Sequence, residues 1–364
     1  MIVIDAHLDL AWNALSWNRD LTLTVPEVRA SEAGMKERNR GTNTVAFPEM
    51  RKGEVAVCLA TVLARASGLG EALLDYRSRE IASAMAQGQL AYYRIMESEG
   101  RLRMLKDWPS LEAHFRNWKT CGGGSEPNGE PLGFILSMEG ADPILSPSQA
   151  AQWWNDGLRV VGMAHYGASA YAHGTGASGG VTRKGRELLK VMEEIGMVLD
   201  MTHLSDESFW QAAKLFRGPV LASHNNCRSL VPGNRQFTDD QIKCLIERDS
   251  VIGAACDDWM LHPGWTQETS RSVVGLEAVV DHIDHVCQLA GNARHSAIGS
   301  DLDGGYGTEQ SPRDLDTIVD LQKLTALLRA RSYQQADIEA VMHGNWLRFF
   351  QRAWTNCRFA SRPG

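Results

Sequence analysis

The fold of this chain is decided between residues 133 and 224, where four apolar runs follow one another: Gly133-Phe-Ile-Leu-Ser-Met-Glu139, Leu158-Arg-Val-Val-Gly-Met-Ala-His165, Met197-Val-Leu-Asp-Met-Thr-His203 and Pro219-Val-Leu-Ala-Ser-His224. A stretch with helical spacing follows each run. Apolar runs without polar alternation indicate strands that are buried on both faces, as parallel strands are. The repeated order of strand and helix therefore predicts βα units around a parallel sheet.

The same pattern extends toward both ends of the chain. Further strands are predicted at residues 2–4, 55–63, 250–256 and 296–301, which gives eight in all. Eight βα units predict a closed TIM barrel. The alternative is an open doubly wound sheet, but the first strand is not followed by the Gly-x-Gly-x-x-Gly turn of such folds.

The connections are predicted less sharply than the strands. We expect one domain over residues 1–364, with an irregular insertion after the first strand and extra helices near the C-terminus. Within the insertion, one short helix is expected over 28–39. A long helix is expected over 70–100, a short extra strand over 102–105 and a glycine-rich surface loop over 121–129.

Composition excludes several classes of protein. Of the 364 residues, 43% are hydrophobic and 22% are charged, which is typical of soluble globular proteins. The net charge of −7 disfavours a nucleic-acid partner. No apolar run reaches the roughly 18 residues of a membrane-spanning helix, and no signal-peptide pattern is evident. Seven scattered cysteines fit a reducing compartment, so we expect a cytoplasmic protein without membrane attachment.

Side chains that bind metals or move protons lie at the ends of six of the eight predicted strands. They are His7, Asp9, Glu139, His165, His203, His224 and Asp301. A barrel brings the carboxyl ends of its strands to one rim, where TIM-barrel enzymes have their active sites. A single buried histidine is more often a hydrogen-bonded core residue than a ligand. The coincidence of so many at one rim predicts a metal site.

The number of candidate ligands favours two metal ions over one. Three imidazoles and two carboxylates exceed the three protein ligands that a catalytic zinc usually has. Five ligands suit two ions that share a carboxylate, about 3.5–4 Å apart. Glu139, from a middle strand, is the natural bridge between an ion at His7 and Asp9 and another at His203 and His224. Such a pair lowers the pKa of a shared water and generates hydroxide near neutral pH.

These residues lie in segments that resemble motifs of the membrane (renal) dipeptidases, a family of the amidohydrolase superfamily. The segments are Asp5-Ala-His-Leu-Asp9, Met138-Glu-Gly140, Ala164-His165, Asp200-Met-Thr-His-Leu-Ser205, Ser223-His224, Asn234-Arg235, Asp239-Asp240, Gly299-Ser-Asp-Leu-Asp-Gly304 and Gly344-Asn-Trp-Leu-Arg348. They follow the order of the family from residue 5 to about residue 350. The resemblance implies two Zn²⁺ ions per chain, bridged by Glu139 and a water or hydroxide. Its implied ligands are the same five residues: His7, Asp9, Glu139, His203 and His224.

The resemblance also implies roles for residues that do not bind metal. His165 would contact the scissile carbonyl oxygen, because an imidazole donor stabilises a developing oxyanion. Arg235 would bind the terminal carboxylate of the substrate, since a guanidinium can hold a carboxylate through two hydrogen bonds. Asp301 would take a proton from the attacking water and pass it to the leaving nitrogen. Asp303 is a rival, but the family pattern favours Asp301.

We therefore expect a zinc-dependent dipeptidase that hydrolyses small unblocked dipeptides by attack of the metal-bridging hydroxide on the amide carbonyl. The family implies tolerance of a D-residue at the C-terminal position and a possible homodimer. The leader, lipid-anchor signal and disulfide cysteines of the secreted animal members are not evident, which favours a bacterial-type soluble member.

One departure from the family leaves the substrate open. Cys256-Asp-Asp-Trp259 stands where the family has a carboxylate-binding tyrosine, and an acid there would repel an acidic terminus. A metal hydrolase acting on another small amide or lactone is therefore the alternative. A non-catalytic metal-binding protein is the third possibility, although no expected ligand is missing.

Overall fold

The computed structural model describes residues 1–70, 73–121 and 129–355, and these contain a nine-stranded parallel sheet. Its strands are β1 (Val3–Leu8), β2 (Val55–Leu63), β3 (Leu102–Met104), β4 (Leu132–Glu139), β5 (Leu158–Gly162), β6 (Val198–Asp200), β7 (Val220–Leu221), β8 (Ile252–Ala254) and β9 (Ser296–Ile298). All nine have both faces buried for most of their length, as the apolar runs predict.

Eight of the strands form a nearly closed barrel. Their order is β7-β6-β5-β4-β2-β1-β9-β8, and β3 pairs with β4 outside this path. The barrel closes between β7 and β8, where the Ala222 N–H donates to Val251 O at 3.0 Å and the Gly253 N–H donates to Ala222 O at 2.8 Å. The predicted TIM barrel is confirmed. The short extra strand expected over 102–105 is also present, as β3.

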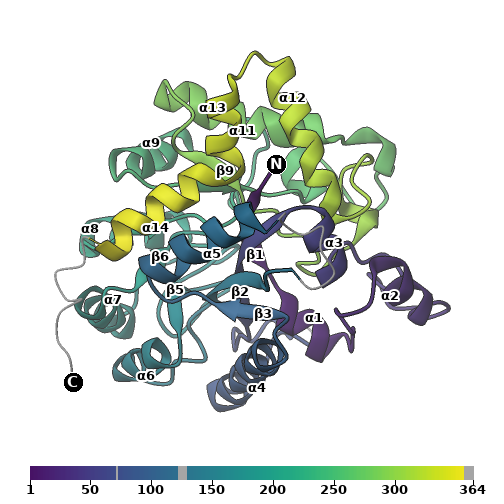
Figure 1. The fold of residues 1–364 in the computed structure, drawn as a ribbon. Coiled ribbons are helices and arrows are strands. Elements are labelled where there is room, and N and C mark those ends of the chain that lie inside the picture. The colour runs from purple at the N-terminus through teal and green to yellow at the C-terminus, as the bar shows by residue number, and fades with distance from the viewer. Residues whose placement is uncertain (71–72, 122–128, 356–364) are drawn as a thin grey trace.

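Helices surround the barrel on its outer side (Figure 1). Those that follow strands are α4 (Arg79–Ser98), α5 (Trp108–Thr120), α6 (Ala150–Asn155), α7 (Arg183–Ile195), α8 (Asp206–Leu215), α9 (Asp239–Glu247), α10 (Asp258–Leu261) and α11 (Leu276–Ala290). Asp107 and Thr238 cap α5 and α9, each accepting the backbone N–H of the residue three positions later.

The insertion after β1 is more regular than predicted. It contains α1 (Leu10–Ser16), α2 (Val25–Ser31) and α3 (Phe47–Lys52), in place of the one helix expected over 28–39. Helix α2 starts earlier because Thr24 and Glu27 form a capping box and Pro26 occupies its first turn. The prediction missed this start because it relied on polar composition alone.

Helix α4 begins at Arg79, nine residues later than predicted. The preceding segment turns instead, because the Asp75 carboxylate accepts the backbone N–H groups of Ser67 and Gly70 at 2.7 and 2.6 Å. Ser78 then caps the helix through the Ile81 N–H. The loop predicted over 121–129 lies mostly outside the described residues.

The C-terminal region is helical, and its last helix packs at the end of the barrel where the strands begin. Its helices are α12 (Leu324–Ala330), α13 (Gln335–Glu339) and α14 (Asn345–Thr355), as the sequence predicts for this region. The Asn345 amide donates to Ser296 O at 2.8 Å, and the Trp346 indole donates to Ile298 O at 2.9 Å. Figure 1 shows α14 running across this end beside α5. The opposite end is left for the candidate site.

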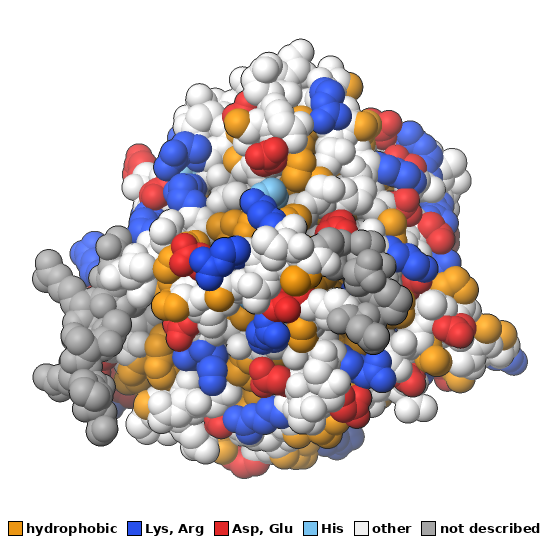
Figure 2. Space-filling model, viewed as in Figure 1, with side chains coloured by type: hydrophobic (Ala, Val, Ile, Leu, Met, Phe, Trp, Pro, Cys, Tyr) orange, Lys and Arg blue, Asp and Glu red, His pale blue; other side chains and the backbone are white. Residues whose placement is uncertain are grey.

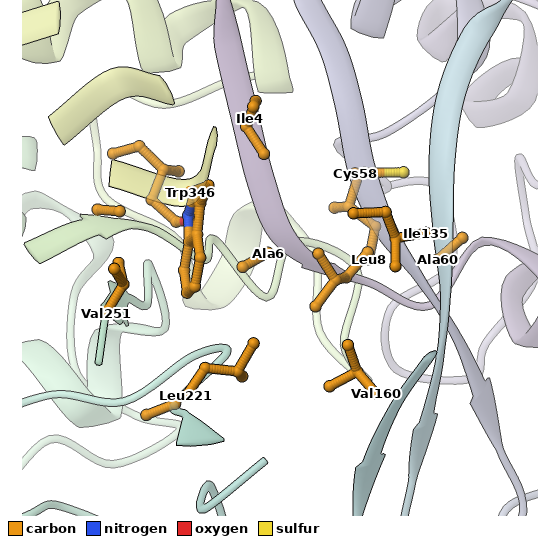
Figure 3. Packing of buried hydrophobic residues seen from close by; sticks show 14 of the residues in the cluster. Ile4, Ala6, Leu8, Cys58, Ala60, Ile135, Val160, Leu221, Val251 and Trp346 are labelled. Carbon is orange, nitrogen blue, oxygen red and sulfur yellow. The ribbon is translucent and has the colours of Figure 1, made fainter. Parts of the chain in front are cut away.

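The core is continuous from the barrel to its helices. Figure 3 shows part of it, with Ile4, Ala6 and Leu8 following one face of β1. Each is at most 1% exposed. Burial of a large aliphatic side chain stabilises a fold by about 1.5–3 kcal/mol, so this core holds the strand ends in fixed positions.

On the surface shown in Figure 2, acidic and basic side chains are interspersed. Among the described helices, none is long and apolar enough to cross a membrane. The described cysteines are free thiols, and Cys58, Cys227, Cys256 and Cys287 are buried.

Candidate active site

The predicted site residues meet at the carboxyl ends of the strands. A cavity of about 220 Å³ opens there, and seven of the eight predicted residues line it: Asp9, Glu139, His165, His203, His224, Arg235 and Asp301. The eighth, His7, lies deeper in β1, and its Nε2 is 3.6 Å from a carboxylate oxygen of Asp9, of Glu139 and of Asp301. Residues nearly 300 positions apart thus become neighbours.

Most of these side chains lie on turns just beyond the strands, which are shorter than predicted. Strand β6 ends at Asp200, three residues before His203, and β9 ends at Ile298, three residues before Asp301. His203 and Asp301 have φ of 65° and 59°, in the left-handed region that non-glycine residues rarely adopt. A side chain at Gly304 would collide with Asp301 Oδ1, since a Cβ there would lie 2.1 Å away. The turns therefore point these side chains toward the barrel axis, and the backbone is locally strained as a result.

Two buried aspartates hold these turns in place. Asp5 Oδ1 accepts the N–H groups of His7 and Ser300 at 3.2 and 2.8 Å, which connects β1 to the turn that carries Asp301. Asp200 Oδ1 accepts the N–H groups of Thr202 and Ser223 at 2.9 and 3.1 Å. These two hydrogen bonds connect the turn that carries His203 to the turn that carries His224. Each aspartate thus fixes two functional side chains relative to each other.

Glu139 is the centre of the cluster. Its Oε1 lies 3.1 Å from His203 Nε2 and 3.2 Å from His224 Nε2, while its Oε2 lies 3.6 Å from His7 Nε2. The two oxygens of one carboxylate therefore face the two halves of the predicted ligand set. This is the arrangement that a bridging carboxylate requires.

The cluster has the chemistry of a metal site. His7 Nε2, Asp9 Oδ1 and Glu139 Oε1 are buried and have no hydrogen-bond partner. Unpaired buried polar atoms are costly, and native proteins pair almost all of them. Three groups of side chains here have potential ligand atoms within 4.8 Å of one another. Imidazole nitrogens with carboxylate oxygens form the donor set that suits zinc and related divalent ions, so these residues fit bound metal.

Hydrogen bonds on the far side of two rings direct their Nε2 lone pairs into the site. Thr175 Oγ1 donates to His203 O at 3.3 Å, so the hydroxyl is left to accept the His203 Nδ1–H at 3.1 Å. Ser223 Oγ donates toward Thr202 Oγ1 and accepts the His224 Nδ1–H at 2.8 Å. Such outer hydrogen bonds fix the tautomer of metal-binding histidines.

Charge repulsion within the cluster favours a bound cation. Burial alone would lower the pKa of His7, but the negative charges of Glu139, Asp9 and Asp301 raise it to about 10. Burial raises the pKa of Glu139 to about 7. Burial, with Glu139 and Asp9 nearby, raises the pKa of Asp301 well above its usual value. A divalent cation would allow the carboxylates to be ionised together.

Arg235 offers a buried positive charge to the cavity. Its guanidinium donates to Asn225 Oδ1 at 2.7 Å and to His224 O at 2.9 Å. Both acceptors are uncharged. A buried guanidinium whose hydrogen-bond partners are uncharged favours an anionic ligand.

Comparison with known proteins identifies the family. Residues 1–360 match the sequence profile of the membrane dipeptidases, peptidase family M19. The chain belongs to this family. The prediction of a metallo-dipeptidase is therefore confirmed at the level of the family.

Named relatives agree with this assignment. Dipeptidase verJ of Clonostachys rogersoniana is 24% identical over 95% of this chain and 82% of its own length. Dipeptidase aclJ of Aspergillus oryzae is 27% identical over 59% of this chain and 50% of its own length. An uncharacterised protein in the pqqA 5′ region of Klebsiella pneumoniae is 27% identical over 61% of this chain and 83% of its own length. The match thus spans about half of the Aspergillus protein and most of the other two.

Two solved structures share the fold over nearly the whole chain. A metallopeptidase from Rhodobacter sphaeroides, solved with a phosphinate mimic of the dipeptide L-Ala-D-Ala, has a TM-score of 0.78 at 22% identity, covering 97% of this chain and 99% of that one. A dipeptidase of family M19 has a TM-score of 0.79 at 22% identity, with the same coverage.

Within this family site, the second acid of the Gly299–Gly304 motif is structural. Asp303 accepts the Thr44 N–H and hydroxyl at 2.7 and 2.8 Å and the Val45 N–H at 3.0 Å, which holds the insertion against the barrel. It does not line the cavity, whereas Asp301 does. The geometry thus favours Asp301 over its rival for proton transfer.

The departure from the family tyrosine does place an acid in the cavity wall. Asp257 lines the cavity, and its Oδ1 accepts the Gln310 amide at 2.7 Å. Burial raises the pKa of Asp257 to about 7, so a neutral carboxylic acid is accessible there near neutral pH. The repulsion of an acidic terminus expected from sequence is therefore weaker than a fixed charge would give.

Three other histidines do not line the cavity: His173, His262 and His282. His282 is buried, and its Nδ1 accepts the Cys227 N–H at 3.0 Å. Sequence reasoning missed Arg65, a buried arginine two residues after β2 that lines the cavity. An arginine directly after an apolar strand is the signal that could have indicated it.

Proposed function

We propose that this chain is a zinc-dependent dipeptidase that hydrolyses small unblocked dipeptides, including those with a D-residue at the C-terminal position. The observation that carries the proposal is the convergence of three imidazoles on the two oxygens of Glu139, in a cavity that also holds Arg235. A metal cluster with a nearby buried guanidinium combines hydrolytic chemistry with recognition of a carboxylate.

In this proposal two zinc ions are held by His7, Asp9, Glu139, His203 and His224. Glu139 bridges them, with His7 and Asp9 on one side and His203 and His224 on the other. When bound, the ions supply a water nucleophile of low pKa and polarise the scissile carbonyl. The unpaired atoms of His7, Asp9 and Glu139 support this assignment.

The remaining site residues act on the substrate. Arg235 binds the terminal carboxylate and so places the amide over Glu139. His165 donates a hydrogen bond to the carbonyl oxygen as negative charge develops there. Asp301, whose raised pKa suits a group that must both accept and release a proton, transfers the proton of the water to the leaving nitrogen.

The dimensions of the cavity support a small substrate. Its volume of about 220 Å³ lies below the roughly 300–1,000 Å³ of sites for drug-sized ligands. The Rhodobacter metallopeptidase binds a mimic of L-Ala-D-Ala within the same fold, which supports a dipeptide of that stereochemistry here. Tyr166, Trp259 and Met260 provide apolar walls for its side chains.

A kinetic screen of L,L-, L,D- and D,L-dipeptides with zinc-loaded protein tests the proposal. We expect turnover of L,L- and L,D-dipeptides and much weaker turnover of carboxyl-amidated analogues. The alternative function, hydrolysis of another small amide or a lactone, is favoured by one observation, the acid Asp257 in the cavity wall. Turnover of uncharged amides or lactones, with no turnover of any dipeptide, would overturn the proposal in favour of this alternative.

A further inference from the structure

We infer that Arg65 is a positioning residue that makes His165 a hydrogen-bond donor to the substrate and prevents it from binding metal. Arg65 Nη1 lies 2.9 Å from His165 Nδ1. The inference rests on the proposed function for its catalytic consequence, but its structural part, the tautomer of His165, stands on the geometry of this pair.

The chemistry of arginine fixes the direction of this hydrogen bond. A guanidinium has only donors and keeps its proton at every physiological pH, so it cannot accept from an imidazole. His165 Nδ1 must therefore accept, and in the neutral ring the remaining proton is on Nε2. That Nε2 lies 3.8 Å from Glu139 Oε1 and faces the cavity. The ring presents an N–H, not a lone pair, to whatever occupies the site.

The contrast with His203 and His224, the two histidines at Glu139 Oε1, shows that the difference is built into the fold. The hydroxyls of Thr175 and Ser223 accept the Nδ1–H of His203 and His224, which leaves lone pairs on the Nε2 atoms of those rings. His165 and His203 are close, with ring centroids 4.4 Å apart, and both could reach one ion with Glu139 by distance alone. The hydrogen-bond partner at Nδ1 therefore determines whether Nε2 of a ring is a hydrogen-bond donor or a metal ligand.

One buried acid holds the backbone on both sides of the pair. Asp142 Oδ2 accepts the N–H of Ala66, the neighbour of Arg65, at 3.0 Å. Its Oδ1 accepts the Ser169 hydroxyl at 2.7 Å and the Ala170 N–H at 3.1 Å, in the segment after His165. Asp142 is itself 2% exposed. Arg65 and His165, a hundred residues apart, are thus held at a fixed separation.

The same segment also holds the backbone of His165 in place. Thr175 N–H donates to His165 O at 3.0 Å, and a Cβ at Gly174 would lie only 1.8 Å from that oxygen. The side chain of Arg65 is 1% exposed, so water does not compete for the imidazole. The pair is therefore a fixed element of the cavity wall.

Kinetics of three variants measure the catalytic part of the inference. Removing the donor in Arg65→Met should lower kcat by about 100-fold, as the loss of one oxyanion donor does. KM should change by less than about threefold, since the ground-state contacts are kept. Arg65→Lys, which also donates to Nδ1, should retain kcat within about tenfold. Arg79→Met is the matched control, because Arg79 is a nearby arginine that bonds Asp142 O and Tyr171 Oη without touching His165.

A double-mutant cycle shows whether Arg65 acts through His165. In a His165→Ala background, Arg65→Met should lower kcat by less than about twofold, because the residue that it positions is already gone. A further loss of kcat of about 100-fold when Arg65→Met is added to His165→Ala, or a large rise in KM on Arg65→Met, would show that Arg65 contacts the substrate directly. Either result would overturn the inference. Unchanged kcat in Arg65→Met alone would overturn it as well.

The tautomer can be measured without substrate. Long-range ¹H–¹⁵N correlation of zinc-loaded protein labelled at histidine should show the proton of His165 on Nε2, assigned by loss of its signals in His165→Gln. In Arg65→Met the shifts should move toward a mixture of tautomers, while Arg79→Met keeps the native pattern. A proton on Nδ1, or shifts unaffected by Arg65→Met, would contradict the inference. Failure of the dipeptide screen with the Nε2 tautomer present would instead refute only the proposed function.

Discussion

At the scale of single residues, two acids two positions apart have different roles. Asp301 lines the cavity and lies 3.6 Å from His7 Nε2, whereas Asp303 is bonded to Thr44 and Val45 away from it. Both follow the same apolar strand and both have left-handed backbone, with φ of 59° and 61°, so in the sequence only the family pattern favours Asp301. In the structure, the hydrogen bonds of Asp303 to Thr44 and Val45 separate it from the cavity.

A pair of substitutions tests this division. Asp301→Asn should lower kcat by about 10²–10⁴-fold, because an amide cannot relay the proton, with little change in thermal stability. Asp303→Asn should instead lower the free energy of unfolding by about 1–3 kcal/mol and leave kcat within about threefold. Steady-state kinetics and thermal denaturation of both variants make the comparison. A loss of kcat in Asp303→Asn alone would show that the two roles are assigned the wrong way round.

Arg235 should act on binding through the substrate carboxylate. Arg235→Ala is expected to raise KM for a free dipeptide by about 30- to 100-fold, which corresponds to the roughly 2–3 kcal/mol of a buried charge-assisted hydrogen bond. Any turnover of a carboxyl-blocked analogue should be much less affected. Equal losses for the free and the blocked substrate would contradict a role in carboxylate binding.

At the scale of elements, the strands were predictable and their ends were not. Apolar runs locate all eight strands of the barrel because burial on both faces leaves a clear pattern. Strand β6 nevertheless stops at Asp200, where the sequence pattern runs on to His203, because the Asp200 carboxylate takes two backbone N–H groups and turns the chain. The start of α4 was missed for a similar reason, the turn around Asp75.

The segment 166–180 illustrates how an element outside the barrel supports the site. Its Thr175 hydroxyl bonds the Nδ1 of His203. Thr175→Val keeps the shape of the side chain and removes that bond, so metal affinity should fall by about 10–100-fold, as it does when outer-shell partners of metal ligands are lost. Competition with a chelator of known zinc affinity measures the change. Thr182→Val, which alters a hydroxyl that caps α7, is the control and should leave zinc affinity unchanged.

At the scale of the whole molecule, the barrel gathers the site from most of the sequence. The convergence of the candidate ligands was predictable because the barrel topology brings the carboxyl ends of the strands to one rim. The supporting contacts were not predictable. Arg65 with His165, and Asp5 with Ser300, depend on side-chain directions that no spacing in the sequence encodes.

Burial of acids beside the site also makes the stability of the molecule depend on pH. Asp258 is fully buried, neither of its carboxylate oxygens has a hydrogen-bond partner, and burial raises its pKa from 3.8 to about 8. Its contribution to stability is therefore full below pH 3.8 and is lost as the pH rises through about 8. The advantage in stability of Asp258→Asn over the wild type should grow by about 4 kcal/mol between pH 5 and pH 9, because each pH unit up to the folded pKa corresponds to about 1.4 kcal/mol. Denaturant unfolding at the two pH values measures this difference, and an equal effect at both would contradict a neutral buried Asp258.

The central claim is that two zinc ions bridged by Glu139 make this chain a dipeptidase. Zinc titration of chelator-stripped protein, followed by hydrolysis of an L,D-dipeptide, tests it most directly. The account predicts no activity without metal and a rise to full activity at about two equivalents of zinc per chain. The variant His7→Ala should stay folded and bind one equivalent fewer. Full activity after stripping, or a plateau at one equivalent that His7→Ala leaves unchanged, would contradict the account.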